Sequence, residues 1–280
     1  MNKTTNHSPY RRRKVSHKDG FASRTKRRLR WLPNTLTLCN SWCGFVSILW
    51  TLSIYERSTN IYDMVFVSSL IILGAMVFDV LDGFAARMLN ATSMIGLQMD
   101  SLADMVTFGV APAVLMAVTT HWLQGVQTTM EVRITYLLCA VYVGGAALRL
   151  ATYNVKAMEH TGDSDVFHGL PSPGAAAAIV SVLLAMRVCN LDLKNWVMVL
   201  PVYAAVLGIL MVSPLPYRHL GKWLLTRKNN QPVKIMILIV LLFAVGIFRE
   251  YAIFTMITLY VLSGPANALY QLIFRKGKSK

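Results

Sequence analysis

Long apolar runs separated by short polar segments dominate the chain from residue 34 onward. A membrane-spanning helix needs about 20 predominantly apolar residues, and eight runs approach that length. They cover residues 34–55, 62–82, 95–120, 132–152, 173–189, 195–212, 233–248 and 250–270. The pattern therefore predicts an all-α fold, a polytopic membrane helix bundle of about eight transmembrane helices.

Composition supports this prediction, because 55% of the 280 residues are hydrophobic and only 15% are charged. Such values are typical of a membrane protein and not of a soluble domain. The four cysteines lie in or beside apolar runs, so we interpret them as small buried hydrophobic residues and not as a disulfide framework.

The formal net charge of +15 indicates an anionic lipid surface or anionic substrates as partners. Nucleic acid is a weaker alternative, because most basic residues flank the apolar runs. Lysine and arginine are concentrated in every second polar segment, which the positive-inside rule assigns to the cytoplasm. These segments are 1–33, 83–94, 153–172, 213–232 and 271–280.

Four aspartates interrupt the apolar sequence between residues 79 and 104. Asp79 and Asp82 are three residues apart and Asp100 and Asp104 are four apart, so each pair shares one face of a helix. A short break between Gly83 and Gly96 would let the two helices run antiparallel, with the two pairs facing each other. Ionisable groups in membrane segments usually mark function, although helix-end aspartates in solvated loops are the simpler alternative.

Carboxylates packed in this way repel each other unless a cation neutralises them. Their hard oxygen atoms suit Mg²⁺, Mn²⁺ or Ca²⁺ and not zinc, and two ions could share the cluster. Gly83 would allow a ligand to approach the backbone, and Arg87 could hold a phosphate with two parallel hydrogen bonds.

The pattern Asp79-x2-Asp82-Gly83-x2-Ala86-Arg87-x8-Gly96-x3-Asp100-x3-Asp104 resembles the signature of the CDP-alcohol phosphotransferase family at every position. The resemblance implies a divalent metal site, Mg²⁺ or Mn²⁺ and up to two ions, on the four aspartates, with Asp104 also acting as general base. It further implies that a CDP-linked donor contacts Gly83, Arg87 and Ser93.

The first apolar run opens with Pro33-Asn34-Thr35-Leu36-Thr37. Proline and threonine suit a helix start, so simple capping is one interpretation. In the family the equivalent segment often contacts the CDP moiety, which makes Asn34, Thr37 and also Thr35 donor-binding candidates by resemblance.

Three further patches resemble the branch of the family that uses L-serine as acceptor. They are Leu148–Asn154, the loop Phe167–Pro173 and the segment Ser213–Lys222. The resemblance makes Arg149, Asn154, Arg218 and Lys222 candidates for acceptor binding. Arg149 lies in apolar sequence and needs an anionic partner, unless its side chain extends to the lipid headgroups.

The resemblance implies transfer of a phosphatidyl group from CDP-diacylglycerol to L-serine by a homodimer. The charge asymmetry places the active site at the cytoplasmic face of the membrane, and we expect a bacterial inner membrane. The same donor with glycerol 3-phosphate, inositol phosphate or choline as acceptor is the alternative, and a membrane cation transporter is a weaker one. Three regions are expected: a basic cytoplasmic tail at 1–32, whose end can form an interfacial helix, the transferase domain at 33–225, and an additional transmembrane hairpin with a basic tail at 226–280.

Overall fold

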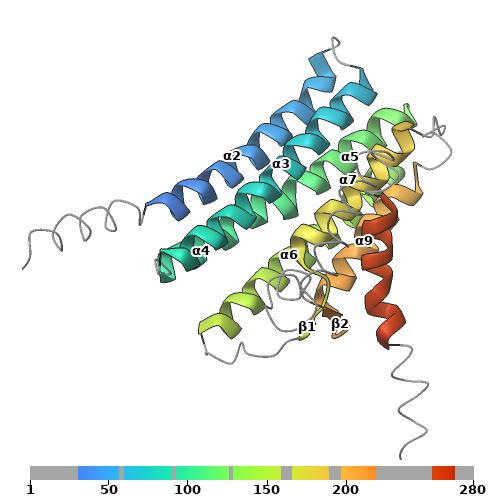
Figure 1. Ribbon diagram of the computed structural model, residues 1–280. Helices are drawn as coiled ribbons and strands as arrows, with labels where there is room; N and C mark the ends of the chain where they lie inside the picture. The colour runs from blue at the N-terminus through green and yellow to red at the C-terminus, as the bar shows by residue number, and fades with distance from the viewer. Residues whose placement is uncertain are drawn as a thin grey trace, which may run out of the picture.

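The computed structural model describes residues 31–56, 60–89, 93–125, 129–158, 166–188, 197–218 and 254–268. They form a bundle of long helices that run up and down beside one another (Figure 1). The α-helices are α2 (Leu32–Leu52), α3 (Ile61–Met88), α4 (Met94–Asp104), α5 (Ala111–Gln124), α6 (Thr129–Met158), α7 (Ser172–Val188) and α9 (Val199–Val212).

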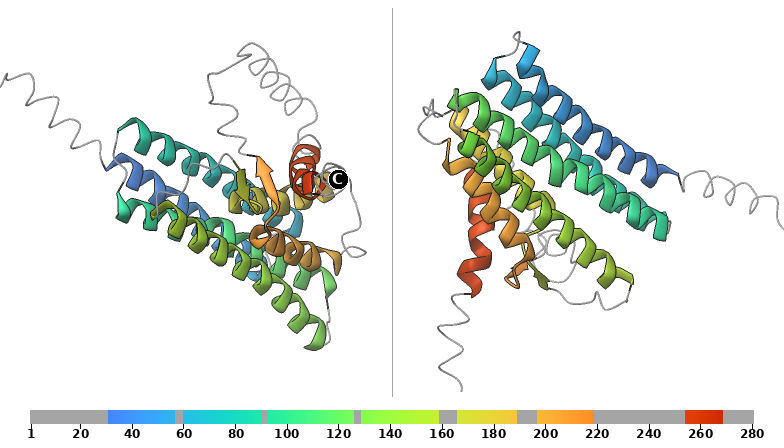
Figure 2. Two further views of the ribbon diagram at one scale, coloured as in Figure 1. Left: turned by 90° about the horizontal axis from the view of Figure 1, so that it is seen from below. Right: turned by 180° about the vertical axis from the view of Figure 1, so that it is seen from behind.

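Shorter elements complete the description. A 3₁₀ turn, η1 (Ser53–Glu56), ends α2, and a π-helical turn, η2 (Met105–Val110), joins α4 to α5. Two three-residue strands, β1 (Val166–His168) and β2 (Pro216–Arg218), pair antiparallel. Residues 254–268 form a further helix, which lies on the side of the bundle away from α2 (Figure 2).

Four continuous helical segments of the described residues are long and apolar enough to cross a membrane. They are Leu32–Glu56, Ile61–Met88, Met94–Gln124 and Thr129–Met158, and they coincide with the first four predicted spans. The predicted class, a polytopic helical membrane bundle, is confirmed. The number eight stays a prediction, because α7 and α9 are shorter and the span 233–248 lies outside the described residues.

The predicted break between Gly83 and Gly96 is too long. Helix α3 continues through Gly83 and Arg87 and ends only at Met88, because alanines and an arginine are strong helix formers that outweigh one glycine. The chain then turns and α4 runs back antiparallel to α3 (Figure 1). Asp79, Gly83 and Arg87, at spacings of four, therefore lie on one face of a single helix.

Hydroxyl groups and a glycine hold α2 against its neighbours. Thr51 Oγ1 lies 2.9 Å from Ser68 Oγ on α3, and Ser47 Oγ donates to the Ser68 carbonyl at 3.1 Å. A side chain at Gly44 would lie 2.8 Å from the Thr107 Cα, so glycine is what allows α2 to approach η2 this closely. These contacts stabilise helix packing where the surroundings are apolar.

The π-helical turn η2 directly follows Asp104 and separates α4 from α5. A π-helical turn disrupts the regular hydrogen bonding of an α-helix. Here Tyr142 on α6, which is fully buried, donates its hydroxyl to the Phe108 carbonyl at 2.7 Å. Helix α6 thereby holds the turn that directly follows Asp104.

Candidate active site

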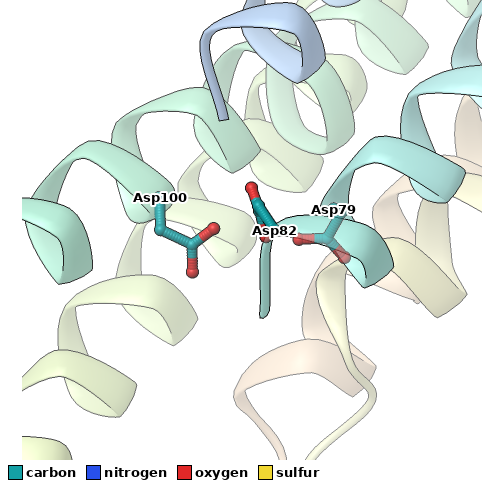
Figure 3. A group of neighbouring side chains, drawn as sticks. All are labelled: Asp79, Asp82 and Asp100. Atoms are coloured by element: carbon teal, nitrogen blue, oxygen red, sulfur yellow. The ribbon is translucent and has the colours of Figure 1, made fainter. Parts of the chain in front are cut away.

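Three carboxylates from two helices, α3 and α4, lie close to one another (Figure 3). Asp79 and Asp82 come from α3 and Asp100 from α4, and one oxygen of each lies within 4.8 Å of the others. The helical spacing in the sequence predicts this convergence, because each pair occupies one face of its helix.

Asp104 lies one turn after Asp100 and is only 8% exposed. Its side chain lies beside that of Asp79, so the fourth aspartate adjoins the convergent three. Like charges at such distances in a partly buried site repel strongly. The cluster is therefore stable only with protons or a cation among its oxygens.

Helix α2 contacts one aspartate of each pair. Thr37 Oγ1 donates to Asp82 Oδ2 at 2.8 Å, and Asn40 Nδ2 donates to Asp104 Oδ1 at 3.2 Å. Thr37 and Asn40 are three residues apart and so point to the same side of α2. Thr37 is a donor-binding candidate by family resemblance, whereas the sequence predicts no role for Asn40.

The residues of the cluster fit a divalent cation. All of the candidate metal-ligand atoms are carboxylate oxygens, the ligand type that Mg²⁺ and Mn²⁺ prefer. In addition, Asp100 Oδ1 is buried and has no hydrogen-bond partner among the described residues. A buried acceptor of this kind is open to a cation, as far as the described residues go.

The donor-binding candidates lie around the same end of the bundle. A side chain at Gly83 would meet nothing within 4 Å, so the space beside this backbone is open. Arg87 is exposed one turn further along α3. Asn34 lies close to the start of α4, because a side chain at Gly96 would lie 3.6 Å from its Oδ1.

Ser93 and Thr35 each make a local hydrogen bond. Ser93 caps α4, since its Oγ accepts from the Gly96 amide at 3.0 Å. Thr35 is exposed and donates its hydroxyl to the Trp31 carbonyl at 3.0 Å. Ser93 is therefore an N-cap, whereas the Thr35 hydroxyl bonds back to a carbonyl one turn earlier and does not cap α2, whose start has no side-chain cap.

Of the acceptor-binding candidates, the structure describes the side chains of Arg149 and Asn154 on α6. Asn154 Oδ1 accepts from Ser101 Oγ at 2.9 Å, which joins α6 to the residue next to Asp100. Arg149 is half-buried, and its charge acts on Tyr153 and Tyr260. Tyr153 is close to both Arg149 and Asp100, and Asn154 contacts the residue next to Asp100, so this end of α6 borders the acidic cluster.

Two of the three patches that resemble the serine-using branch, Phe167–Pro173 and Ser213–Lys222, contact each other through the strands β1 and β2. Phe167 of β1 lies opposite Tyr217 of β2, and Gly169 with φ of 88° turns the chain so that its amide donates to the Leu215 carbonyl at 2.9 Å. A positive φ favours glycine. Arg218 belongs to β2, but its side chain and all of Lys222 lie outside the described residues.

The helix of residues 254–268 adds a residue that the sequence analysis missed. Tyr260 lies near Arg149 and against Gly174 of α7, 3.3 Å from where a side chain on that glycine would lie. Tyr217 anchors this helix by donating its hydroxyl to the Val261 carbonyl at 3.1 Å. No short-range pattern in the sequence connects positions 149 and 260.

The structure thus combines a helical membrane bundle with a cluster of carboxylates that could hold a metal ion. The chain belongs to the CDP-alcohol phosphatidyltransferase family, which matches residues 30–210. The family predicted from the aspartate signature is thereby confirmed.

The chain is similar to several enzymes named CDP-diacylglycerol–serine O-phosphatidyltransferase. That of Helicobacter pylori strain J99 is 30% identical over 251 residues, covering 88% of this chain and 96% of the relative. The Bacillus subtilis enzyme is 29% identical over 204 residues, covering 69% and 93%. The Saccharomyces cerevisiae enzyme is 36% identical over 163 residues, covering 56% and 54%.

Proposed function

We propose that this protein transfers the phosphatidyl group of CDP-diacylglycerol to L-serine and releases CMP. The observation that carries the proposal is the convergence of the Asp79, Asp82 and Asp100 oxygens within 4.8 Å, in a chain of this family. The relatives named above for this reaction support serine as the acceptor. Family membership argues against a cation transporter.

Asp79, Asp82, Asp100 and Asp104 would hold one or two Mg²⁺ or Mn²⁺ ions. When bound, such ions neutralise the pyrophosphate of the donor and the negative charge that develops on CMP. The buried, unpaired Oδ1 of Asp100 supports this assignment.

Arg87 and Gly83 would bind the donor's pyrophosphate. The Arg87 guanidinium can give two parallel hydrogen bonds to phosphate oxygens. The open space beside Gly83 lets the phosphates approach the α3 backbone. Asn34, Thr35 and Ser93, at the facing ends of α2 and α4, would border the nucleotide.

In the transfer step the serine hydroxyl oxygen forms a bond to the β-phosphorus, and the bond from that phosphorus to the CMP oxygen breaks. Asp104 would take the hydroxyl proton, because it adjoins the cluster and is buried. Arg149 would pair with the serine carboxylate, since an unpaired charge at a membrane-embedded site is costly. Asn154, Arg218 and Lys222 would complete the acceptor pocket.

The active site would face the cytoplasm of a bacterial inner membrane, because lysine and arginine are concentrated in the segments on its side. Residues 33–225 would form the transferase domain, and residues 226–280 an additional transmembrane hairpin with a basic tail. We further expect a homodimer, as the family resemblance implies.

The test is an acceptor competition with purified protein in detergent–lipid micelles containing CDP-diacylglycerol and Mn²⁺. L-serine, glycerol 3-phosphate, inositol phosphate and choline are supplied together at equal concentration, and the lipid products are identified by mass spectrometry. Phosphatidylserine as the dominant product supports the proposal. Dominance of any other lipid, or no lipid product with any acceptor, overturns it.

A further inference from the structure

Asn40 is a buried amide in the middle of a membrane helix. It is 0% exposed, and its Nδ2 donates to Asp104 Oδ1 at 3.2 Å. Its backbone carbonyl also accepts from Thr107 Oγ1 at 2.9 Å. Because Gly44 lets Thr107 pack directly on α2, the Asn40 backbone is held from the same segment that carries Asp104.

Packing alone does not explain an amide at this position. Burying a polar group costs free energy unless its hydrogen bonds are made. Asn40 Oδ1 is buried without a partner among the described residues, so the amide is only partly satisfied. A leucine would fill a similar volume without that cost, and the contact that distinguishes asparagine here is its bond to Asp104.

We infer that Asn40 is a positioning residue that holds one oxygen of Asp104 and leaves the other free for the acceptor hydroxyl. The inference rests on the proposed function, in which Asp104 takes the serine proton. A carboxylate that is held by a fixed hydrogen-bond donor does not have to reorient during the reaction. Such pre-organisation of catalytic groups contributes much of the rate enhancement in enzyme active sites. Asn40 would act through Asp104, with which it shares a hydrogen bond.

The test compares Asn40→Leu with the wild-type protein. Loss of an outer partner of a metal-site carboxylate typically costs about 10–100-fold, and here we expect that loss in kcat. The KM values for CDP-diacylglycerol and for serine should change by less than about twofold, because uniform substrate binding is untouched. Mn²⁺ affinity, measured by electron paramagnetic resonance without substrate, should fall by less than kcat does, because Asp79, Asp82 and Asp100 still converge on the ion.

Thr51→Val is the matched control. Thr51 lies on the same helix, about 16 Å further along, is equally buried and makes a hydrogen bond to Ser68. This variant should lose thermal stability because its hydrogen bond is lost, and it should keep its kcat.

Asn40→Gln, which retains the amide, should recover part of the rate that Asn40→Leu loses.

Unchanged kcat in Asn40→Leu overturns the inference and leaves the proposed function standing. A rate that returns to the wild-type value at saturating Mn²⁺ also overturns it, because Asn40 would then act on metal affinity. If Asn40→Leu does not fold, Asn40→Ala is assayed against the same criteria. Failure of the wild-type protein to form phosphatidylserine overturns both the proposed function and this inference.

Discussion

Thr37 on α2 and Asp82 on α3 are joined by a hydrogen bond of 2.8 Å between two buried side chains. The Pro33 carbonyl lies 3.0 Å from the same Thr37 Oγ1, so this carbonyl and the Asp82 carboxylate share the single proton of the hydroxyl. Together with Asn40 and Asp104, this bond makes α2 the element that sets the distance between the two aspartate pairs.

Thr37→Val should therefore weaken the cation site. Valine keeps the shape of threonine but cannot donate to Asp82, and lost outer-shell contacts cost about tenfold or more in metal affinity. The measurement is Mn²⁺ titration followed by electron paramagnetic resonance. Ser47→Ala, which loses a hydroxyl elsewhere on α2, is the control. An unchanged Mn²⁺ affinity with a raised KM for CDP-diacylglycerol would instead assign Thr37 to donor binding.

Gly83→Ala should raise the KM for CDP-diacylglycerol by about tenfold without loss of stability. Nothing lies within 4 Å of the added methyl group, so only a bound donor would meet it. In a helix interior the substitution itself favours folding by roughly 0.5–1 kcal/mol. Gly74→Ala on the same helix, also without neighbours, should stabilise equally and leave KM unchanged. Equal KM values in the two variants would remove Gly83 from the donor site.

Arg149→Ala should raise the KM for serine far more than that for CDP-diacylglycerol. A hydrogen bond to a charged group contributes about 1.5–3 kcal/mol, which corresponds to roughly 10–100-fold. Arg133→Ala, an exposed arginine at the other end of α6, is the control. Ethanolamine lacks the carboxylate, so it should be a poor acceptor for the wild-type protein. An ethanolamine rate equal to that of serine would show that no carboxylate clamp exists.

Gly145→Ala should destabilise the bundle by about 1–3 kcal/mol, the usual range for overpacking. A methyl group at Gly145 on α6 would collide with the backbone of Gly208 on α9. Thermal unfolding in detergent measures the effect. Gly144→Ala is the matched control, because its methyl group would meet nothing within 4 Å. Identical melting temperatures for the two variants would mean that α6 and α9 do not pack this closely.

The sequence predicts the parts of the fold that depend on local pattern. Apolar runs of membrane-spanning length locate α2, α3, α4 to α5, and α6, and spacings of three and four residues bring the Asp79, Asp82 and Asp100 oxygens together. Both follow from the geometry of one or two neighbouring helices.

Features that depend on the packing of helices far apart in the sequence cannot be predicted from local pattern. The continuation of α3 through Gly83 reflects competition between one glycine and its helix-forming neighbours. The bond from Asn40 to Asp104 and the position of Tyr260 near Arg149 depend on how separate helices are placed. The sequence does contain a sign of the role of Asn40, because it is a polar residue three positions after Thr37 on the same face of an apolar helix.

The most direct test of the central claim is to measure CMP and phosphatidylserine together, with purified protein, CDP-diacylglycerol and L-serine, before and after removal of divalent cations. The account predicts equal amounts of both products, complete loss of both in saturating chelator, and recovery on adding Mn²⁺. Asp79→Asn, Asp82→Asn and Asp100→Asn should each remain inactive after that addition. Phosphatidylserine formation at the full rate in saturating chelator would contradict the claim that the aspartate cluster works through a bound cation.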